Sequence, residues 1–333
     1  MTSVHLVTAG GPADGGGHLS RTIAMAEAFA GTAARVSFEI LRGAPTESQA
    51  DRLRELGVGM ASPSDDADAV VLIDLPDPNE VGTRWPAERL AVFDDREWFR
   101  GAAALVVQPS LATWSGSADA GRVLAGYDYA PIRSSLRRLG DEPPPEATPA
   151  EVVVCFGGSD PEDVGARVVP AIAAGGAWTT VAIVGPGYRG RLDEFGRAGR
   201  PTDPNVLRDP PDLEPRLAAA TLVVSGAGTM KFELALLGRP MILLAVVDDQ
   251  LPVGPPFAGT GAAEYLGDGR TIDPAAIVAA VTRLMADQPA RAAMATRGRA
   301  VVDGRGAERV AAAVLELTSR RGGPPHPTDA STG

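Results

Sequence analysis

Short apolar runs alternate regularly with helix-like segments along the chain, and this alternation narrows the possible folds to a few. In the first half the apolar runs are Val4–Val7, Val36–Leu41, Val70–Leu75, Leu90–Phe93 and Leu105–Val107. Helical patterns lie between them, notably at Leu19–Ala30 and Ser48–Leu56. Near-continuous apolar strands separated by helices are typical of a parallel sheet covered on both faces. We therefore expect a doubly wound α/β domain in the first half.

A proline-rich segment separates this half from a second one of similar size. Residues 140–149 read GDEPPPEATP, which is compatible with neither a helix nor a central strand. The alternation then restarts with apolar runs at Val152–Phe156, Thr180–Val184, Val206–Leu207, Leu222–Val224 and Met241–Val247, followed by an Ala-rich helical region over Pro274–Thr318. The predicted organisation is a first domain over 1–140, a linker over 141–150, a second domain over 151–319 and a disordered tail over 320–333.

Charge and hydropathy limit the classes of partner. The net charge is −11, whereas proteins that bind nucleic acid gather Lys and Arg to neutralise phosphates. No apolar run reaches 18 residues, and the N-terminal segment lacks the pattern of a secretory signal. We expect a cytoplasmic protein with no nucleic-acid partner and no stable insertion into a membrane. The single cysteine, Cys155, lies in an apolar run and is expected to be a small core residue.

The first glycine turn, residues 10–17, follows the first apolar run and leads into His18. Its glycines allow the backbone to approach a ligand closely. Of the three histidines, His5 lies inside the first strand and His326 lies in the tail. Imidazole is the side chain best suited to proton transfer near neutral pH. His18 is therefore the candidate general base, and the alternative is a residue that only caps the helix.

Two further glycine turns follow apolar runs in the second half. The second glycine turn, residues 156–161, reads FGGSDP, and the third, residues 225–229, reads SGAGT. A helix with Glu233 one turn in follows the third turn, and the next apolar run ends in Asp-Asp-Gln at 248–250. Backbone N–H groups at a glycine-rich helix start suit a phosphate, and a carboxylate can bind the two hydroxyls of a ribose. The pattern indicates a nucleotide diphosphate, with plain turns and a solvated glutamate as the alternatives.

Several common site motifs are absent from the sequence. The first glycine turn does not match G-x-G-x-x-G, no Gly-Lys-Ser/Thr phosphate loop occurs, and no nucleophile-elbow pattern is present. Acidic pairs occur at Asp65-Asp66, Asp94-Asp95 and Asp248-Asp249, but no His/Cys/Asp cluster has metal-ligand spacing. We expect no tightly bound metal and no cofactor.

The order of the motifs resembles a known family. The matching segments are Gly15–Arg21 (G-x-G-H-x-x-R), Ile73-Asp74, Val92–Asp95, Tyr129–Arg133, Phe156–Asp160 and Ser225–Gln250. They are similar to the UDP-sugar hydrolase of pseudaminic-acid biosynthesis and its spore-coat polysaccharide relatives, and more distantly to the GlcNAc transferase of peptidoglycan assembly. The resemblance covers most of residues 1–270. It implies the GT-B architecture, in which two Rossmann-like lobes face each other across a cleft.

The resemblance also implies roles for individual residues. His18 is the expected base at the anomeric carbon of a nucleotide sugar, and Glu233 is expected to bind the ribose. The remaining nucleotide-binding residues are expected to be Gly226, Ala227, Gly228, Thr229 and Met230. The expected substrate-binding residues are Gly16, Gly17, Arg21, Asp74, Gly157, Gly158, Ser159, Asp249 and Gln250. For Arg21, the alternative to pairing with a phosphate is a residue that fixes the first helix.

One departure from the hydrolase pattern affects the expected reaction. The hydrolase carries a tyrosine two residues after the aspartate that matches Asp74, and this chain has Pro76 there. We therefore expect a glycosyltransferase that moves a sugar from a nucleoside diphosphate (NDP) donor, such as a UDP-sugar, to a soluble hydroxyl acceptor. The alternatives are an NDP-sugar hydrolase and a nucleotide-sugar-binding protein without catalysis.

Overall fold

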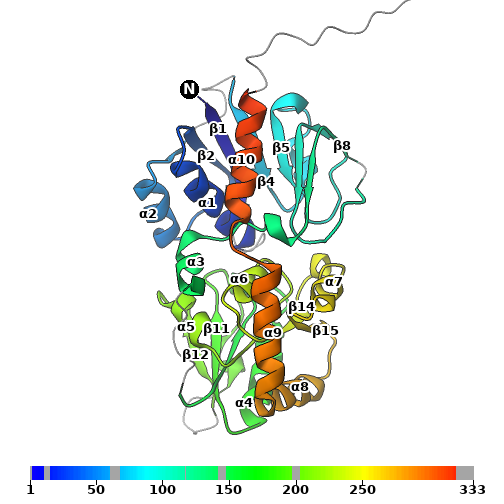
Figure 1. Cartoon of the computed structure of the whole chain (residues 1–333). Coiled ribbons are helices and arrows are strands. Elements are labelled where there is room, and N and C mark those ends of the chain that lie inside the picture. Colours follow the sequence, from blue (N-terminus) through cyan, green and yellow to red (C-terminus); the bar gives the residue numbers. More distant parts are fainter. Residues whose placement is uncertain are drawn as a thin grey trace, which may run out of the picture.

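Two α/β lobes lie one above the other in the structure, a computed structural model (Figure 1). It describes residues 2–10, 16–60, 68–116, 118–141, 148–196 and 203–319. The predictions for Gly15, for most of the linker and for the tail therefore fall outside the described residues.

The first lobe is built on a seven-stranded sheet in the order β3-β2-β1-β4-β5-β7-β9, and all its neighbouring strands run parallel. The strands are β1 (Ser3–Gly10), β2 (Arg35–Gly43), β3 (Gly59–Met60), β4 (Val70–Asp74), β5 (Leu90–Phe93), β7 (Leu105–Gln108) and β9 (Val123–Ala125). The short strands β6 (Ala102–Ala103) and β8 (Asp119–Ala120) form a separate pair. The helices are α1 (Gly17–Ala30), α2 (Glu47–Glu55) and the 3₁₀ helices η2 (Pro78–Val81), η3 (Ala87–Arg89) and η4 (Tyr127–Tyr129).

The second lobe contains a six-stranded parallel sheet in the order β12-β11-β10-β13-β14-β15. Its strands are β10 (Glu151–Cys155), β11 (Thr179–Val184), β12 (Asn205–Arg208), β13 (Leu222–Gly226), β14 (Met241–Ala245) and β15 (Glu264–Asp268). Its helices are α4 (Val164–Ala174), α5 (Leu213–Ala219), α6 (Met230–Leu236), α7 (Gly254–Gly259), α8 (Pro274–Ala286), α9 (Gln288–Val301), η5 (Leu192–Phe195) and η6 (Asp248–Gln250). Helix α3 (Ser134–Asp141) lies at the end of the predicted first domain but packs against α5 and α6 of the second lobe, with Leu136 in the core of that lobe. The two parallel sheets confirm the predicted doubly wound fold.

The C-terminal helix α10 (Gly306–Ser319) returns to the first lobe, although the sequence analysis assigns residues up to 319 to the second. It packs against α1 and β4, and Val310 and Val314 are fully buried in the core of the first lobe (Figure 1). The Ala-rich region forms three separate helices, α8, α9 and α10. Asp287 caps α9 by accepting a hydrogen bond from the Ala290 N–H at 2.9 Å, and Gly304 adopts φ 75° before α10. The helix pattern is thus correct, whereas its assignment to one lobe is wrong.

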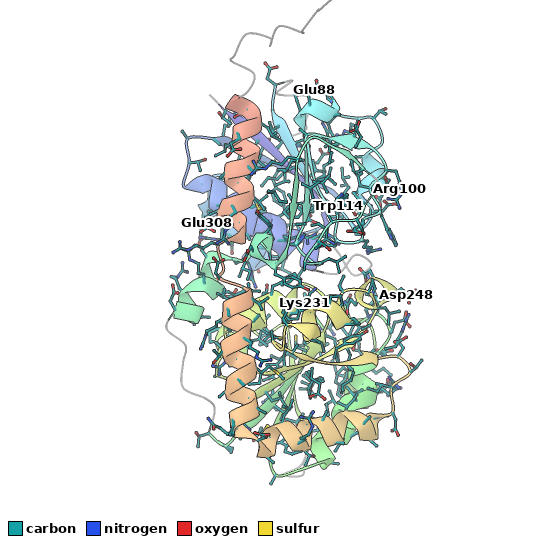
Figure 2. The ribbon with its side chains drawn as sticks, turned by 45° about the vertical axis from the view of Figure 1, so that its right-hand side comes forward. Glu88, Arg100, Trp114, Lys231, Asp248 and Glu308 are labelled. Atoms are coloured by element: carbon teal, nitrogen blue, oxygen red, sulfur yellow. The ribbon has the colours of Figure 1, made fainter. Side chains whose placement is uncertain are left out.

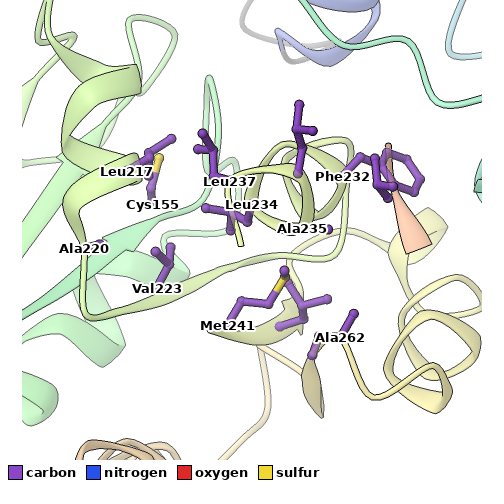
Figure 3. Packing of buried hydrophobic residues seen from close by; sticks show 14 of the residues in the cluster. Cys155, Leu217, Ala220, Val223, Phe232, Leu234, Ala235, Leu237, Met241 and Ala262 are labelled. Atoms are coloured by element: carbon purple, nitrogen blue, oxygen red, sulfur yellow. The ribbon is translucent and has the colours of Figure 1, made fainter. Parts of the chain in front are cut away.

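The second-lobe core is continuous from the sheet to α6. Figure 3 shows Cys155 and Val223, from the strands, packed beside Leu234 of α6 and Met241 of β14. Burial raises the pKa of the Cys155 thiol to about 12, so the thiolate form is disfavoured. Cys155 is therefore a core residue, as predicted.

The sequence analysis misses the short or polar strands β3, β6, β8, β9 and β15. Strands of two or three residues carry too few side chains for an apolar periodicity to be detected. β15 reads EYLGD and is only partly buried, so it lacks an apolar run. Among the described residues, no helix is both long enough and apolar enough to cross a membrane.

Candidate functional site

A cleft with a volume of about 1220 Å³ lies where the carboxyl ends of strands from both sheets meet. Parallel α/β sheets place ligand sites at this end of the strands. Of the residues that the sequence analysis assigns to the site, those lining the cleft are Gly16, Gly17, His18, Gly157, Gly158, Ser159, Gly226, Ala227, Gly228, Thr229, Met230, Glu233, Asp249 and Gln250. Arg21 and Asp74 do not line it.

His18, the second residue of α1, pairs with Asp74 at the end of β4. The distance from His18 Nδ1 to Asp74 Oδ1 is 2.7 Å, and the imidazole is 18% exposed at the wall of the cleft. When Nδ1–H donates to the carboxylate, Nε2 carries the free lone pair and can accept a proton. The pair thus has the geometry of an oriented general base.

Burial excludes Arg21 and Asp74 from the predicted contact with substrate. Arg21 is 4% exposed and Asp74 is 1% exposed. Arg21 Nε donates to Asp74 Oδ2 at 2.6 Å, and Arg21 Nη1 lies 2.7 Å from Asp95 Oδ2. Arg21 sits one helical turn after His18, which places its guanidinium beside the same carboxylate. The buried Arg21–Asp74 ion pair therefore fixes the orientation of the His18 imidazole from the interior side.

The ionisation of Asp74 is fixed by this arrangement. Burial alone would raise the pKa of Asp74, but Arg21 and His18 outweigh it and lower the pKa to about 2. The Asp74 and Asp95 carboxylates overcome the effect of burial on Arg21 and raise its pKa above the ordinary value. Asp74 is therefore a carboxylate at neutral pH and acts as a hydrogen-bond acceptor for His18.

Gly16 and Gly17, at the end of the first glycine turn, lie beside the second and third glycine turns of the other lobe. A methyl group at Gly17 would lie 3.0 Å from Thr229 Oγ1, and one at Gly16 would lie 4.0 Å from the Cα of Gly158. Larger side chains at these two positions would push the lobes apart. The start of α1, which carries His18, is therefore adjacent to the second and third glycine turns.

The third glycine turn presents backbone donors to the cleft. Its Thr229 makes no side-chain capping bond to α6, which is only seven residues long. The N–H groups of Gly228 and Thr229 have no acceptor among the described residues. Such donors suit an anion.

Asp249 and Gln250 lie beside the third glycine turn, and both already have partners. Gln250 Oε1 accepts from the Val246 N–H at 3.1 Å, and its amide group faces Gly226 and Gly228. Asp249 Oδ2 accepts from Arg96 Nη2 of the first lobe at 2.7 Å, whereas Asp249 Oδ1 is buried and has no hydrogen-bond partner among the described residues. Arg96 therefore connects the two lobes across the cleft.

Glu233 forms part of a second charged cluster between the lobes. Arg133 Nη2 lies 3.6 Å from Glu233 Oε1, and Arg133 Nη1 lies 2.9 Å from Glu214 Oε1. Burial raises the pKa of Glu233, and Arg133 offsets part of this effect. Glu233 is thus a half-buried carboxylate rather than the solvated side chain of the alternative interpretation.

The sequence analysis assigns no role to several charged residues that line the cleft, among them three cations in or beside the predicted motifs. Arg96 follows the acidic pair Asp94-Asp95, Arg133 ends the Tyr129–Arg133 motif, and Lys231 follows the third glycine turn. The motifs place each residue near a strand end. The carboxylate partners of Arg96 and Arg133 are far away in the sequence, so spacing does not reveal them. Lys231 instead folds back onto the carbonyls of its own turn, which leaves no pattern in the sequence either.

Gly185 packs directly against the backbone of the second glycine turn. A methyl group at Gly185 would lie 2.4 Å from the carbonyl oxygens of both Gly157 and Gly158. Gly185→Ala is expected to lower the free energy of unfolding by about 1–3 kcal/mol, because backbone atoms must move to make room. Urea unfolding checks this value. Gly259→Ala, where no atom lies within 4 Å of the new methyl group, is the matched control and is expected to change stability little.

Comparison with solved structures defines the class of fold. The two facing lobes form the GT-B fold of glycosyltransferases. The chain is similar to MurG of Acinetobacter baumannii, with a TM-score of 0.60 and 16% identity over 95% of this chain and 100% of that chain. It is also similar to the spinosyn rhamnosyltransferase SpnG, solved with thymidine diphosphate, with a TM-score of 0.56 and 14% identity over 95% of this chain and 100% of that chain.

A curated relative is similar in sequence as well. The spore coat polysaccharide biosynthesis protein SpsG of Bacillus subtilis (strain 168) is 23% identical over 205 residues, which is 59% of this chain. The chain spans 59% of the length of that relative. No protein-family model matches the chain.

Proposed function

We propose that this protein is a glycosyltransferase that moves a sugar from an NDP-sugar to a soluble hydroxyl acceptor. The single observation that carries the proposal is the His18–Asp74 pair, placed beside the glycine turns of the opposite lobe. A base and a group of anion-binding donors thus meet in one cleft.

The first lobe supplies the base in the proposed reaction. His18 Nε2 takes the proton of the acceptor hydroxyl as its oxygen bonds to the anomeric carbon. The bond from that carbon to the diphosphate oxygen breaks, and the electron pair leaves with the NDP. Asp74 orients the ring and stabilises the imidazolium that forms.

The second lobe holds the donor in this proposal. Backbone N–H groups of Gly228 and Thr229, helped by Gly157–Ser159, face the diphosphate, and Glu233 binds the ribose. The Ala227 N–H does not take part, because it already donates to the Leu244 carbonyl at 2.8 Å. Asp249 and Gln250 bind the sugar, so Asp249 exchanges Arg96 for sugar hydroxyls. These donors stabilise the negative charge that builds on the leaving diphosphate. The thymidine diphosphate bound to SpnG, a protein of the same fold, supports this class of donor.

Two observations favour a hydroxyl acceptor over water. Pro76 replaces the tyrosine of the hydrolase pattern and itself lines the cleft. The cleft volume of about 1220 Å³ exceeds the range of about 300–1000 Å³ that is typical for one small ligand. The extra room fits a second substrate beside the donor.

A thermal-stability screen with UDP-, TDP-, GDP- and CDP-sugars tests the donor class. One of them is expected to raise Tm, because a ligand at 100 times its Kd stabilises the native state by about 2.7 kcal/mol. NDP release that requires an added acceptor supports the transferase, and equal release without one identifies the hydrolase. Binding of an NDP-sugar without any turnover would identify a nucleotide-sugar-binding protein without catalysis. Activity is expected to persist in EDTA, since the proposed chemistry uses side chains and backbone donors alone.

A further inference from the structure

Lys231 is the one lysine among the 31 basic residues of the chain. It is the second residue of α6, directly after the third glycine turn, and it is 1% exposed. Figure 2 shows Lys231 at the end of the second lobe that faces the first. Its position at the wall of the cleft distinguishes it from an ordinary surface lysine.

The ammonium group is held by the turn itself. Lys231 Nζ donates to the carbonyl oxygens of Ala227 at 2.9 Å and Gly228 at 3.2 Å. It also lies 4.3 Å from the centre of the Phe232 ring and 6.0 Å from that of Phe257. No carboxylate of the described residues forms an ion pair with it within 4 Å.

These two bonds set the direction of the peptide groups. In a trans peptide the C=O and N–H bonds point in opposite directions. The carbonyls of Ala227 and Gly228 point at the ammonium, so the N–H groups of Gly228 and Thr229 point away from it. Those are the two donors without an acceptor among the described residues.

We propose that Lys231 is the positioning residue and fixed positive charge of the third glycine turn, where it prepares the turn for the diphosphate of the donor. The inference rests on the proposed function and assigns to this site a charge that the backbone alone does not supply. A lysine fits this place because its ammonium is a compact charge with three donors on a flexible stem, whereas a guanidinium is planar and larger.

The charge balance around Lys231 supports an anionic ligand. Burial lowers the pKa of Lys231 to about 8; Asp95 and Asp249 raise it, and Arg21 lowers it further. Among the described residues, these are the three charged groups that act on Lys231, and they come from the first lobe and from η6. A bound diphosphate adds negative charge and raises the pKa. Affinity is therefore highest below pH 8 and falls above it, by at most tenfold per pH unit.

Because the chain has a single lysine, ¹³C labelling of lysine Cε gives one NMR resonance that reports on this site. In the free protein its titration midpoint is expected near pH 8. A saturating concentration of whichever of UDP, TDP, GDP or CDP binds is expected to raise the midpoint by at least one pH unit. A midpoint that a bound nucleotide leaves unchanged overturns the role of Lys231.

Calorimetry of Lys231→Met supplies the second measurement. The variant is expected to bind the same NDP at least tenfold more weakly at pH 7, to lose the pH dependence above pH 8, and to bind the parent nucleoside with unchanged affinity. Equal NDP affinity in wild type and variant overturns the proposal while leaving the proposed function intact. If wild-type protein binds none of the four diphosphates, both proposals are wrong.

Arg239→Met is the matched control for loss of a buried cation. Arg239 is 8% exposed and also donates to backbone carbonyls, those of Leu237 and Ala220, but it does not line the cleft. This variant is expected to lose stability and to keep the wild-type NDP affinity. Weak NDP binding by both Lys231→Met and Arg239→Met would show that losing a buried cation damages the fold. That result would overturn the proposed role of Lys231 in binding.

Discussion

His18→Ala is expected to lower the turnover rate by about 10²–10⁴-fold, the usual contribution of a general base. Affinity for the NDP is expected to change by less than about threefold, because the nucleotide lies against the second lobe in the proposed complex. Steady-state kinetics with the NDP-sugar found by the thermal screen, together with calorimetry of NDP binding, measure both quantities.

His18→Gln distinguishes the loss of the base from the loss of side-chain volume at the wall of the cleft. Glutamine preserves a polar side chain at the wall of the cleft but does not accept the proton, so turnover is expected to stay low. Wild-type turnover in either variant would exclude His18 as the base. A binding protein without catalysis would show no turnover in wild type either.

Asp74→Asn is expected to reduce both turnover and stability. The amide no longer stabilises the imidazolium and leaves Arg21 with Asp95 as its remaining carboxylate partner. Removing one partner of a buried ion pair costs about 3–5 kcal/mol, so urea unfolding should show a loss of that size. Turnover, measured where the variant is fully folded, should fall by at least about 10²-fold. Loss of stability with full turnover would restrict Asp74 to a structural role.

The same carboxylate gives a pH signature with a defined sign. The pKa of Asp74 in the folded protein is lowered to about 2, so its contribution to stability is complete above the ordinary carboxyl pKa of about 4. That contribution disappears as the pH falls from about 4 to 2. Asp74→Asn is expected to lack this part of the acid unfolding curve, which circular dichroism at a series of pH values can measure.

The sequence predicts the two sheets well because buried parallel strands are nearly uninterrupted apolar runs. β4 reads VVLID, and all five of its residues are buried. The second and third glycine turns are predicted equally well, since each follows such a run directly. For the same reason, most of the candidate site residues are found at the cleft, although their proposed roles await the experiments above.

Contacts between distant segments are what the sequence does not reveal. Arg21 is one turn from His18 in the chain, which permits either a ligand contact or a contact with Asp74. Only the fold brings β4 beside α1 and buries the arginine. Lys231 reads as an ordinary polar residue of a helix, because the return of its side chain to two carbonyls has no pattern in the sequence. The apolar face of α10 fits either lobe equally well by periodicity alone.

The return of α10 means that the described part of the polypeptide crosses between the lobes at two places, and these two crossings touch. A methyl group at Gly306 would lie 2.2 Å from the carbonyl oxygen of Ala130, and one at Gly304 would lie 3.4 Å from Arg137 Cγ. Because the two crossing segments lie side by side, we expect the lobes to open and close by rotation about this part of the molecule. A fragment that ends at residue 150 is therefore not expected to fold as an independent first lobe, because α10 completes the core of that lobe.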